Sequence, residues 1–274
     1  MATGSSTSHY ALGSSDAEHE RLIRQAGWLT PHTERLFRDA GIGLGHRVLD
    51  VGSGVGDVAL IAARLVGPSG EVLGIERDPR SAAKAGARMA EAGLRNVSFT
   101  QRDAGEFPGD RPFDAVVGRY ILMFLPDPVA ILRSVSRVVR PGGVIAFQEP
   151  CWKSFLEQAA RMPLWSIAAS LLVETFRRSG TSVEMGPALS TIFPAAGLPT
   201  PAISRDTLVG AESWLPDCLH SIRPRMEELN ISLVRLGELE TLAERLQAEV
   251  KAFKATTPLP DLISAWSRKP AASM

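Results

Sequence analysis

The sequence predicts an α/β protein built around a doubly wound, mostly parallel β-sheet with helices on both faces. Between residues 47 and 149, short apolar runs alternate with helical segments, and turns rich in glycine or proline separate them. The runs are almost continuously apolar, which is typical of parallel strands that are buried on both faces. With two later runs included, seven strands are expected, at 47–51, 71–76, 96–101, 113–118, 144–149, 201–210 and 261–266.

Capping residues mark several helix boundaries. Asp78 and Asp127 are each followed by proline, and an acidic N-cap with proline at the first helical position is a strong start signal. Gly93 fits the end of the helix that Asp78 begins. Pro31 is expected to divide a helical stretch over 16–40 into two helices, because the residue before a proline avoids the helical region.

After Pro150 the alternation gives way to helical segments. Apolar residues at helical spacing predict a long helical stretch over 151–180, a helix that ends near Gly197 and a helical pair over 212–253. We expect these segments to form a lid over an apolar pocket, and a role in dimerisation or in extending the core stays open. The expected organisation is an N-terminal arm with helices over 1–45, a ligand-binding core over 46–150, and the helical lid with the closing strands of the same domain over 151–274.

Composition narrows the class of partner. The 274 residues carry 30 Lys and Arg against 30 Asp and Glu, so the formal net charge is zero, and there is no dense basic run. A protein held on nucleic acid normally needs a basic face, so no nucleic-acid partner is expected. No apolar run approaches the ~20 residues of a membrane span, and the polar N-terminus does not resemble a secretory signal. We expect a cytoplasmic monomer or homodimer that binds a small molecule.

Cysteine and histidine show no metal-site pattern. Cys151 and Cys218 lie far apart in the sequence and are expected to be reduced thiols. The histidines are scattered, and no Cys/His spacing typical of a zinc site occurs. The sequence therefore predicts no metal site.

The decisive motif is the run D-V-G-S-G-V-G at 50–56, which follows a predicted strand and precedes a predicted helix. A tight turn between strand and helix needs glycine, because glycine adopts positive φ and lets a ligand approach the backbone closely. The turn is expected at the carboxyl end of the first strand, where open α/β sheets bind their ligands. These residues predict a site for a nucleotide-like ligand.

Spacing argues against a dinucleotide. The fingerprint G-x-G-x-x-G would place its third glycine at position 57, where this chain has Asp57, and the third glycine is Gly56 instead. A carboxylate beside the start of a helix would also repel a pyrophosphate. The Tyr-x-x-x-Lys pair of nicotinamide-dependent oxidoreductases is missing from the sequence, although that class stays open as an alternative.

The run at 50–56 resembles motif I of the class I S-adenosylmethionine (SAM)-dependent methyltransferases, in the ubiquinone-biosynthesis-type branch that acts on small molecules. The resemblance implies a Rossmann-like fold, SAM as cofactor and S-adenosylhomocysteine (SAH) as its product. SAM carries a sulfonium cation and an amino-acid zwitterion but no phosphate, so the acidic Asp50 suits it. The resemblance is specific over residues 10–150 and generic beyond them.

The resemblance assigns the methionine end of the cofactor to the glycine turn. It implies that the turn wraps the methionine portion through Gly52, Ser53 and Gly54. It also implies that Asp50 reaches the amino group, directly or through water. The backbone at Arg119, after the fourth strand, would lie near the methionine portion, with the side chain free to face the substrate.

The resemblance assigns the adenosine end of the cofactor to acidic residues at the ends of the second and third strands. In the family, the acid at the position of Glu76 binds the ribose diol, and residues like Arg77 flank the adenine. Asp103 would accept from the adenine amino group, and the backbone of Ala104 would contact the ring. Without the resemblance, Glu76 is only an acid at a strand end and Asp103 only a residue that starts a loop.

The N-terminal segment resembles the cofactor-covering arm of the same branch. Tyr10 would lie over the cofactor, and Gln25 would reach its carboxylate region. A tail followed by an ordinary amphipathic helix stays open as the simpler interpretation.

Methyl transfer from a sulfonium is an in-line displacement whose leaving group needs no acid, so alignment and exclusion of water are the main requirements. The catalytic candidates follow the fourth and fifth strands and are Arg119, Tyr120 and Glu149. Glu149 is either a base or orienting group, or the cap of a helix that Pro150 opens. We predict methyl transfer to a small, hydrophobic or aromatic metabolite, while the use of SAM in a non-methylating, eliminative or pericyclic reaction stays open.

Overall fold

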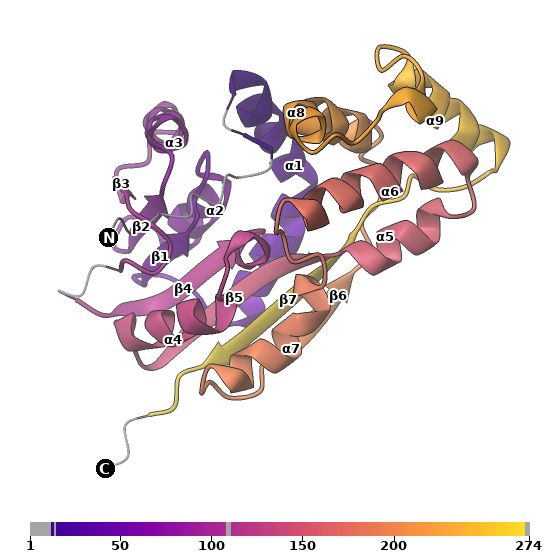
Figure 1. Ribbon diagram of the computed structural model, residues 1–274. Helices are drawn as coiled ribbons and strands as arrows, with labels where there is room; N and C mark the ends of the chain where they lie inside the picture. Colours follow the sequence, from indigo (N-terminus) through magenta and orange to yellow (C-terminus); the bar gives the residue numbers. More distant parts are fainter. Residues whose placement is uncertain (1–11, 14, 108–110, 272–274) are drawn as a thin grey trace, which may run out of the picture.

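The computed structural model describes residues 12, 13, 15–107 and 111–271, which contain one seven-stranded sheet (Figure 1). The strands are β1 Arg47–Val51, β2 Glu71–Glu76, β3 Val97–Gln101, β4 Phe113–Arg119, β5 Val139–Cys151, β6 Ala202–Asp206 and β7 Asp261–Arg268. Their order is β3-β2-β1-β4-β5-β7-β6, and only the pairs that involve β7 are antiparallel. The predicted α/β fold is confirmed. The order reverses between β1 and β4, which puts the expected ligand crevice at the carboxyl ends of these strands.

Helices cover both faces of the sheet. Those of the core are α1 Asp16–Asp39, α2 Asp57–Val66, α3 Pro79–Glu91, α4 Pro128–Val138 and α7 Met185–Ala195. Val48 belongs to the apolar cluster that contains residues of α1 and α2, whereas its neighbour Leu49 belongs to the cluster that contains residues of α4 and α7. Because successive residues of a strand point to opposite faces, a run that is buried throughout must be covered on both sides.

The two acidic N-caps are confirmed. The Asp78 side chain accepts hydrogen bonds from the backbone N–H groups of Arg80 and Ser81 at the start of α3. The Asp127 side chain accepts from the N–H of Ala130 at the start of α4. Each cap satisfies donors that the first helical turn leaves without a partner. These caps set where the two helices begin relative to the strand ends before them.

Pro31 does not divide the first helix, so that prediction is wrong. Helix α1 continues through the proline to Asp39. Leu29 before the proline and Leu36 and Phe37 after it are all buried, so one face packs on the domain along the helix. An internal proline costs about 3 kcal/mol, and burying each large apolar side chain returns roughly 1.5–3 kcal/mol. Packing therefore outweighs the local preference.

The stretch over 151–180 is two helices rather than one long one. Helix α5 spans Trp152–Ala159, and α6 spans Pro163–Arg178. Pro163 stands at the first position of α6, where its missing N–H costs nothing and its fixed φ already fits the helix. The prediction missed this start signal because apolar spacing continues across the break.

The added helices pack together above the carboxyl ends of the strands. Besides α5 and α6 they are α8 Trp214–Glu228 and α9 Leu242–Ala252. Helix α6 contacts α5, α8 and α9, and α8 also contacts α1 (Figure 1). The division into arm, core and lid remains a prediction. Within the residues that the structure describes, no helix combines the length and hydropathy needed to cross a bilayer.

Candidate functional site

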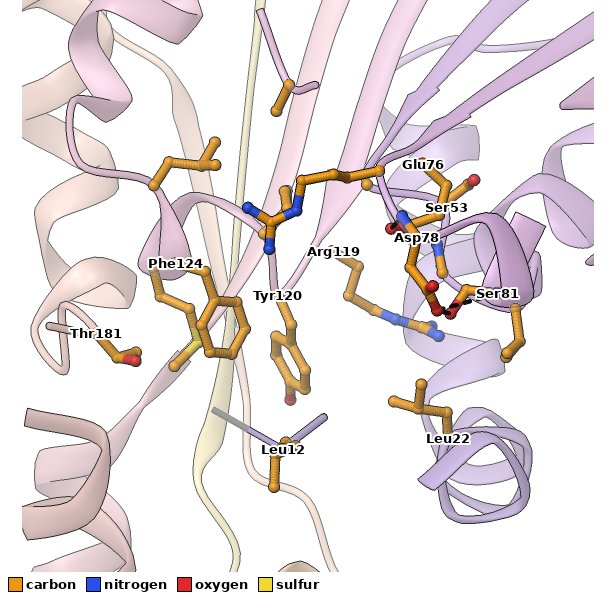
Figure 2. Close-up of a pocket in the computed structure, with 18 of the residues that line it drawn as sticks. Leu12, Leu22, Ser53, Glu76, Asp78, Ser81, Arg119, Tyr120, Phe124 and Thr181 are labelled. Carbon is orange, nitrogen blue, oxygen red and sulfur yellow. Dashed lines mark hydrogen bonds between the residues drawn. The ribbon is translucent and has the colours of Figure 1, made fainter. Parts of the chain in front are cut away.

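A cavity of about 710 Å³ lies at the carboxyl ends of the central strands. Its volume is in the range of roughly 300–1,000 Å³ that is usual for small-molecule sites. Gly52 after β1, Glu76 at the end of β2 and Arg119 at the end of β4 all line it. In Figure 2, Arg119 and Tyr120 occupy the middle of the cavity, between Ser53 and Glu76 on one side and Thr181 on the other.

The glycine turn presents bare backbone to this cavity. Gly52, Gly54 and Gly56 have φ values of 67°, 52° and 86°, which are left-handed. A Cβ atom on Gly52 would lie 2.5 Å from the Ile121 side chain, whereas a Cβ atom on Gly54 would meet no atom within 4 Å in the described part of the chain. Gly54 therefore faces open space, where a ligand can approach the backbone.

Glu76 braces the turn as well as facing the cavity. Its carboxylate accepts hydrogen bonds from the backbone N–H of Gly54, at 2.8 Å, and from that of Asp78, at 2.9 Å. A carboxylate has about four acceptor positions, so two remain for a ligand such as a diol. The sequence indicated only the ligand role, because nothing local shows that the chain folds back over this side chain.

Asp57 forms an ion pair that the sequence did not predict. Its carboxylate lies 2.7 Å from the Arg88 guanidinium of α3, and Arg88 also donates to the backbone carbonyl of Val55. The pair ties the glycine turn to α3 and partly neutralises the acid at the start of α2. The turn is thus braced by Glu76 on one side and by Arg88 on the other.

Asp50 is a buried acid beneath the turn. Only 1% of its surface is exposed, and neither carboxylate oxygen makes a hydrogen bond of normal geometry with the described residues. Burial raises the pKa of Asp50 to about 7, against the opposing field of Arg119. A nearby cation favours the ionised form of such a buried acid. Asp50 is not among the described residues that line the cavity, and its contact with a ligand stays a prediction.

Arg119 and Tyr120 end the fourth strand with an unusual backbone. The Arg119 guanidinium donates to the Thr33 hydroxyl at 2.9 Å, and burial lowers its pKa. Tyr120 has a left-handed φ of 56°, and its N–H donates to the carbonyl of Gln148 at 2.8 Å. Burial also raises the pKa of the Tyr120 hydroxyl. A non-glycine residue in this region stores strain, which is common at ligand sites.

Glu149 caps a different helix from the one that the sequence indicated. It is fully buried, and one carboxylate oxygen accepts from the N–H groups of Ile121, at 3.0 Å, and Leu122, at 2.7 Å. These residues begin the short 3₁₀ helix η1, Leu122–Phe124. Burial raises the pKa of Glu149 to about 8. Glu149 does not line the cavity, and its catalytic role stays a prediction.

The remaining predicted contacts lie at the rim or on α1. Arg77, Asp103 and Ala104 line the cavity beyond the ends of β2 and β3. Gln25 lines it from α1, and its amide oxygen accepts from Arg21 at 2.6 Å and from the Trp214 indole at 3.2 Å. Tyr10 lies outside the described residues.

The sequence did not single out the aromatic wall that completes the cavity. Trp152 lies 5.1 Å from Phe176 and 6.2 Å from Trp214 between ring centroids, and Phe124 lies 6.3 Å from Phe176. All four rings line the cavity. Trp152 follows the end of β5 directly, so its place near the cavity has a local cause. Nothing local brings the others to the site, since the fold of the added helices decides their position.

His19 and Ser81 are two further lining residues that sequence reasoning missed. The His19 ring lies 3.0 Å from the Ser81 hydroxyl, which in turn donates to the Asp78 carboxylate at 2.7 Å. This chain of contacts joins α1 to the start of α3. The N-cap position of Asp78 is the one local signal that pointed to this place.

Comparisons with known proteins agree with this geometry. A family model described as a methyltransferase domain matches residues 43–183, which are 141 of the 274 residues. The chain is 38% identical over 146 residues to an aklanonic acid methyltransferase of Streptomyces sp. strain C5, covering 53% of this chain and 65% of that protein. It is 32% identical over 164 residues to a ubiquinone/menaquinone biosynthesis C-methyltransferase of Pseudomonas paraeruginosa, covering 56% and 64%. The matches thus span slightly less than two thirds of these relatives.

Solved structures share the fold at low sequence identity. A putative methyltransferase from Bacillus halodurans matches with a TM-score of 0.57 at 19% identity, covering 87% of this chain and 99% of that one. The [4+2]-cyclase SpnF matches with a TM-score of 0.56 at 20% identity, covering 89% and 82%. With the family model matching over half of its length, this chain belongs to the methyltransferase domain family.

Proposed function

We propose that the protein is a SAM-dependent methyltransferase that acts on a small, hydrophobic or aromatic metabolite and releases SAH. The observation that carries the proposal is the glycine turn over a buried acid. A Cβ atom on Gly54 would meet no atom of the described residues within 4 Å, and among the same residues the Asp50 carboxylate beneath has no partner of normal geometry. A cationic ligand without phosphate fits this pairing, whereas a pyrophosphate would meet Asp57 at the helix start.

The residues around the turn fit the rest of such a cofactor. SAM supplies an electrophilic methyl group on a sulfonium when it is bound. Glu76 keeps two acceptor positions for a ribose diol, and Asp103 and Ala104 stand at the rim for the adenine. The Gln25 amide oxygen accepts hydrogen bonds from Arg21 and Trp214, so the NH₂ group of the same amide points its donors toward a ligand carboxylate in this proposal. Tyr10 is proposed to cover the same end.

The acceptor is proposed to bind against the aromatic wall. Trp152, Phe176 and Trp214 form an apolar surface that excludes water. In Figure 2, Tyr120 stands between Phe124 of the aromatic wall and Ser53 of the glycine turn. In-line displacement needs alignment and a dry site more than it needs an acid or a base. The left-handed backbone of Tyr120 and the hydrogen bonds from the next two residues to Glu149 hold this part of the chain in place between the aromatic wall and the glycine turn.

The proposal extends to the setting of the enzyme. The formal net charge of zero supports a small-molecule substrate rather than nucleic acid. We propose that the protein works in the cytoplasm as a monomer or homodimer. The relatives named above are an aklanonic acid methyltransferase and a ubiquinone/menaquinone biosynthesis C-methyltransferase, which supports the same substrate class.

The test is to detect SAH together with a methylated acceptor. The protein is incubated with SAM and a panel of aromatic acids, phenols and quinols, and both products are measured by mass spectrometry. Equal amounts of SAH and methylated product are expected. Conversion of an acceptor without SAH formation would favour the non-methylating use of SAM and contradict methyl transfer.

A further inference from the structure

The ionisable groups are unevenly distributed around the cavity. Every carboxylate among the described lining residues stands on the side of the glycine turn and the ends of β2 and β3: Asp57, Glu76, Asp78 and Asp103. Figure 2 shows Glu76 and Asp78 on that side, with Phe124 and Thr181 on the opposite side. His19 belongs to the carboxylate side as well, because its ring contacts Ser81 at 3.0 Å.

The opposite side, the aromatic half, is walled by Phe124, Trp152, Phe176 and Trp214. In the described part of the chain, its ionisable lining groups that can lose a proton are the Tyr120 hydroxyl and the Cys218 thiol. Burial raises the pKa of both, that of Cys218 to about 12. Both groups therefore keep their protons near neutral pH and cannot take one from a substrate.

Two further groups near this half do not act as a base. Arg21, which donates to the Cys218 sulfur, is paired with the Glu18 carboxylate at 2.7 Å. Glu149 lies behind the cavity surface and does not line it. A substrate in the aromatic half thus meets no described side chain that accepts its proton.

We propose that the aromatic half receives the methyl acceptor as an oxyanion, a planar apolar molecule whose own acidic group is ionised before it binds. The group is a carboxylic acid or an acidic enol or phenol, which share this chemistry. The inference rests on the proposed function, since it names the substrate class for the same site.

The bond changes favour an anion in such surroundings. The lone pair of the oxyanion forms the new O–C bond to the methyl group while the C–S bond breaks and its electron pair stays on sulfur. An anion and a sulfonium thus give a neutral ester or ether and a neutral thioether, and apolar walls favour this loss of charge. A neutral amine would instead become an ammonium ion, and a proton would remain to be removed where no described side chain accepts it.

Arg119 is a cation that lines the cavity from the end of β4, and in Figure 2 its side chain points toward the carboxylate side, where the charges of Asp57 and Asp50 act on it. Its guanidinium donates to the Thr33 hydroxyl, and no carboxylate of the described residues lies within 4.0 Å of it. An arginine that lacks such a close partner can donate to an incoming oxyanion. Figure 2 shows the Tyr120 side chain pointing away from the Arg119 guanidinium, so its hydroxyl, which stays protonated, is a separate donor in the cavity.

A binding experiment without turnover tests the charge of the acceptor. Quenching of tryptophan fluorescence reports on Trp152 and Trp214, and the probes are 2-naphthoate, its neutral isostere 2-naphthamide, and 2-naphthylamine. Each is titrated into the protein saturated with neutral SAH or with sinefungin, which carries a protonated amine near the sulfonium position. We expect 2-naphthoate to bind at least about tenfold tighter with sinefungin than with SAH, because each factor of ten needs only ~1.4 kcal/mol of attraction.

The neutral probes serve as the matched control. The affinity of 2-naphthamide is expected to change less than about twofold between the two cofactor analogues, which is ~0.4 kcal/mol. Equal naphthoate affinity with both analogues, or tighter binding of 2-naphthylamine than of 2-naphthoate, would overturn the inference. If SAH binds but no probe quenches, the inference fails and the cofactor site stands; if SAH does not bind, both fail.

The pH dependence of methylation distinguishes the two oxyanion sources. At SAM concentrations that saturate the protein at every pH, which removes the effect of Asp50 on cofactor binding, we expect kcat/KM for 2-naphthoate to stay flat from pH 6 to 9. That for 2-naphthol should rise with its own ionisation, near the phenol pKa of about 10. 2-Hydroxy-1,4-naphthoquinone is the third probe and represents the acidic enols. An ester product identifies the carboxylate source, and an ether product the enol or phenol source. An inflection at one pH shared by all three probes would mean that the protein supplies a base, which contradicts the inference.

Discussion

At the scale of single residues, the site depends on groups held in states that they would not adopt in water. Asp50 and Glu149 are buried acids whose pKa values rise to about 7 and about 8. Tyr120 carries a left-handed backbone, with φ of 56°. Such features cost stability in the absence of a ligand, so their effects are measurable in the free protein.

The ionisation of Asp50 should make cofactor binding depend on pH. Its ordinary pKa is 3.8 and its folded value is about 7, so the acid gains its charge between pH 6 and 8. We expect the affinity for SAM in calorimetry to rise over this interval and the Asp50→Asn variant to bind about tenfold more weakly at pH 8, with a flat profile. Equal affinity of variant and wild type at pH 8 would contradict the role of the charge.

The same acid links stability to pH with a definite sign. Between its unfolded and folded pKa values the folded protein holds a proton that the unfolded chain has released, so the free energy of unfolding falls as pH rises from about 4 to about 7. Asp50→Asn should therefore be more stable than the wild type at pH 8, with the difference disappearing near pH 4. Urea denaturation at the two pH values measures this, and an Asn variant less stable at pH 8 would refute it.

Two glycines of the turn form a matched pair. Gly54→Ala places its Cβ in open space, so the fold should lose only the ~1–2 kcal/mol of a left-handed alanine while SAH binding is strongly weakened. Gly52→Ala drives its Cβ to 2.5 Å from Ile121 and should destabilise the fold further. Thermal denaturation and calorimetry separate the two effects. Full SAH affinity in Gly54→Ala would mean that the ligand does not approach this backbone.

At the scale of elements, α1 joins the two sides of the cavity. His19 links it to α3, and Gln25 links it to Trp214 at the start of α8. Trp214 thus makes two kinds of contact, since its N–H donates to the Gln25 amide oxygen while its ring belongs to the aromatic wall. Trp152 has the same ring in the same wall, but its indole N–H has no partner among the described residues.

These two tryptophans allow a paired prediction. Trp214→Phe removes the hydrogen bond to Gln25 and is expected to weaken SAH binding roughly threefold to tenfold, as befits one hydrogen bond of ~1 kcal/mol. Trp152→Phe makes the same replacement of an indole by a smaller phenyl ring but removes no hydrogen bond. The SAH affinity of this variant should therefore stay within about twofold of that of the wild type. Calorimetry checks both variants, and equal losses in the two would show that ring size, not the N–H, matters.

The cap on η1 has a testable consequence of its own. Glu149→Gln keeps an oxygen that can accept from the Ile121 and Leu122 amides, whereas Glu149→Ala leaves both amides without a partner. We expect Ala to cost roughly 1–3 kcal/mol for each buried amide and Gln to cost far less. The wild type should also lose stability as pH rises toward 8, because its folded pKa lies above the ordinary 4.5. Urea denaturation of both variants at pH 6 and 9 gives the answer.

At the scale of the whole molecule, local signals account for the core and long-range packing accounts for the rest. Apolar runs, the caps at Asp78 and Asp127 and the glycine turn are each readable within a few residues, so the sheet and the position of the glycine turn at the cavity could be predicted. The partner of Glu149 could not, because η1 lies in a different part of the chain. Neither could the bond between Gln25 and Trp214, which are 189 residues apart.

Pro31 and Pro163 show the same division. Proline at 163 begins a helix as its local preference demands, and the apolar pattern around it hid the break. Proline at 31 lies inside a helix against its local preference, because burial of Leu29, Leu36 and Phe37 holds the helix together. Local rules fail where tertiary contacts contribute more free energy than the local preference.

The most direct test of the central claim is a thermal-shift comparison of SAH with NAD on the wild-type protein. A ligand that binds only the folded state stabilises it by RT ln(1 + [L]/Kd), about 2.7 kcal/mol at a hundredfold excess over Kd. The glycine turn over Asp50, with Asp57 at the helix start, predicts a clear rise in Tm with SAH and no rise with NAD. A rise with NAD and none with SAH would contradict the account.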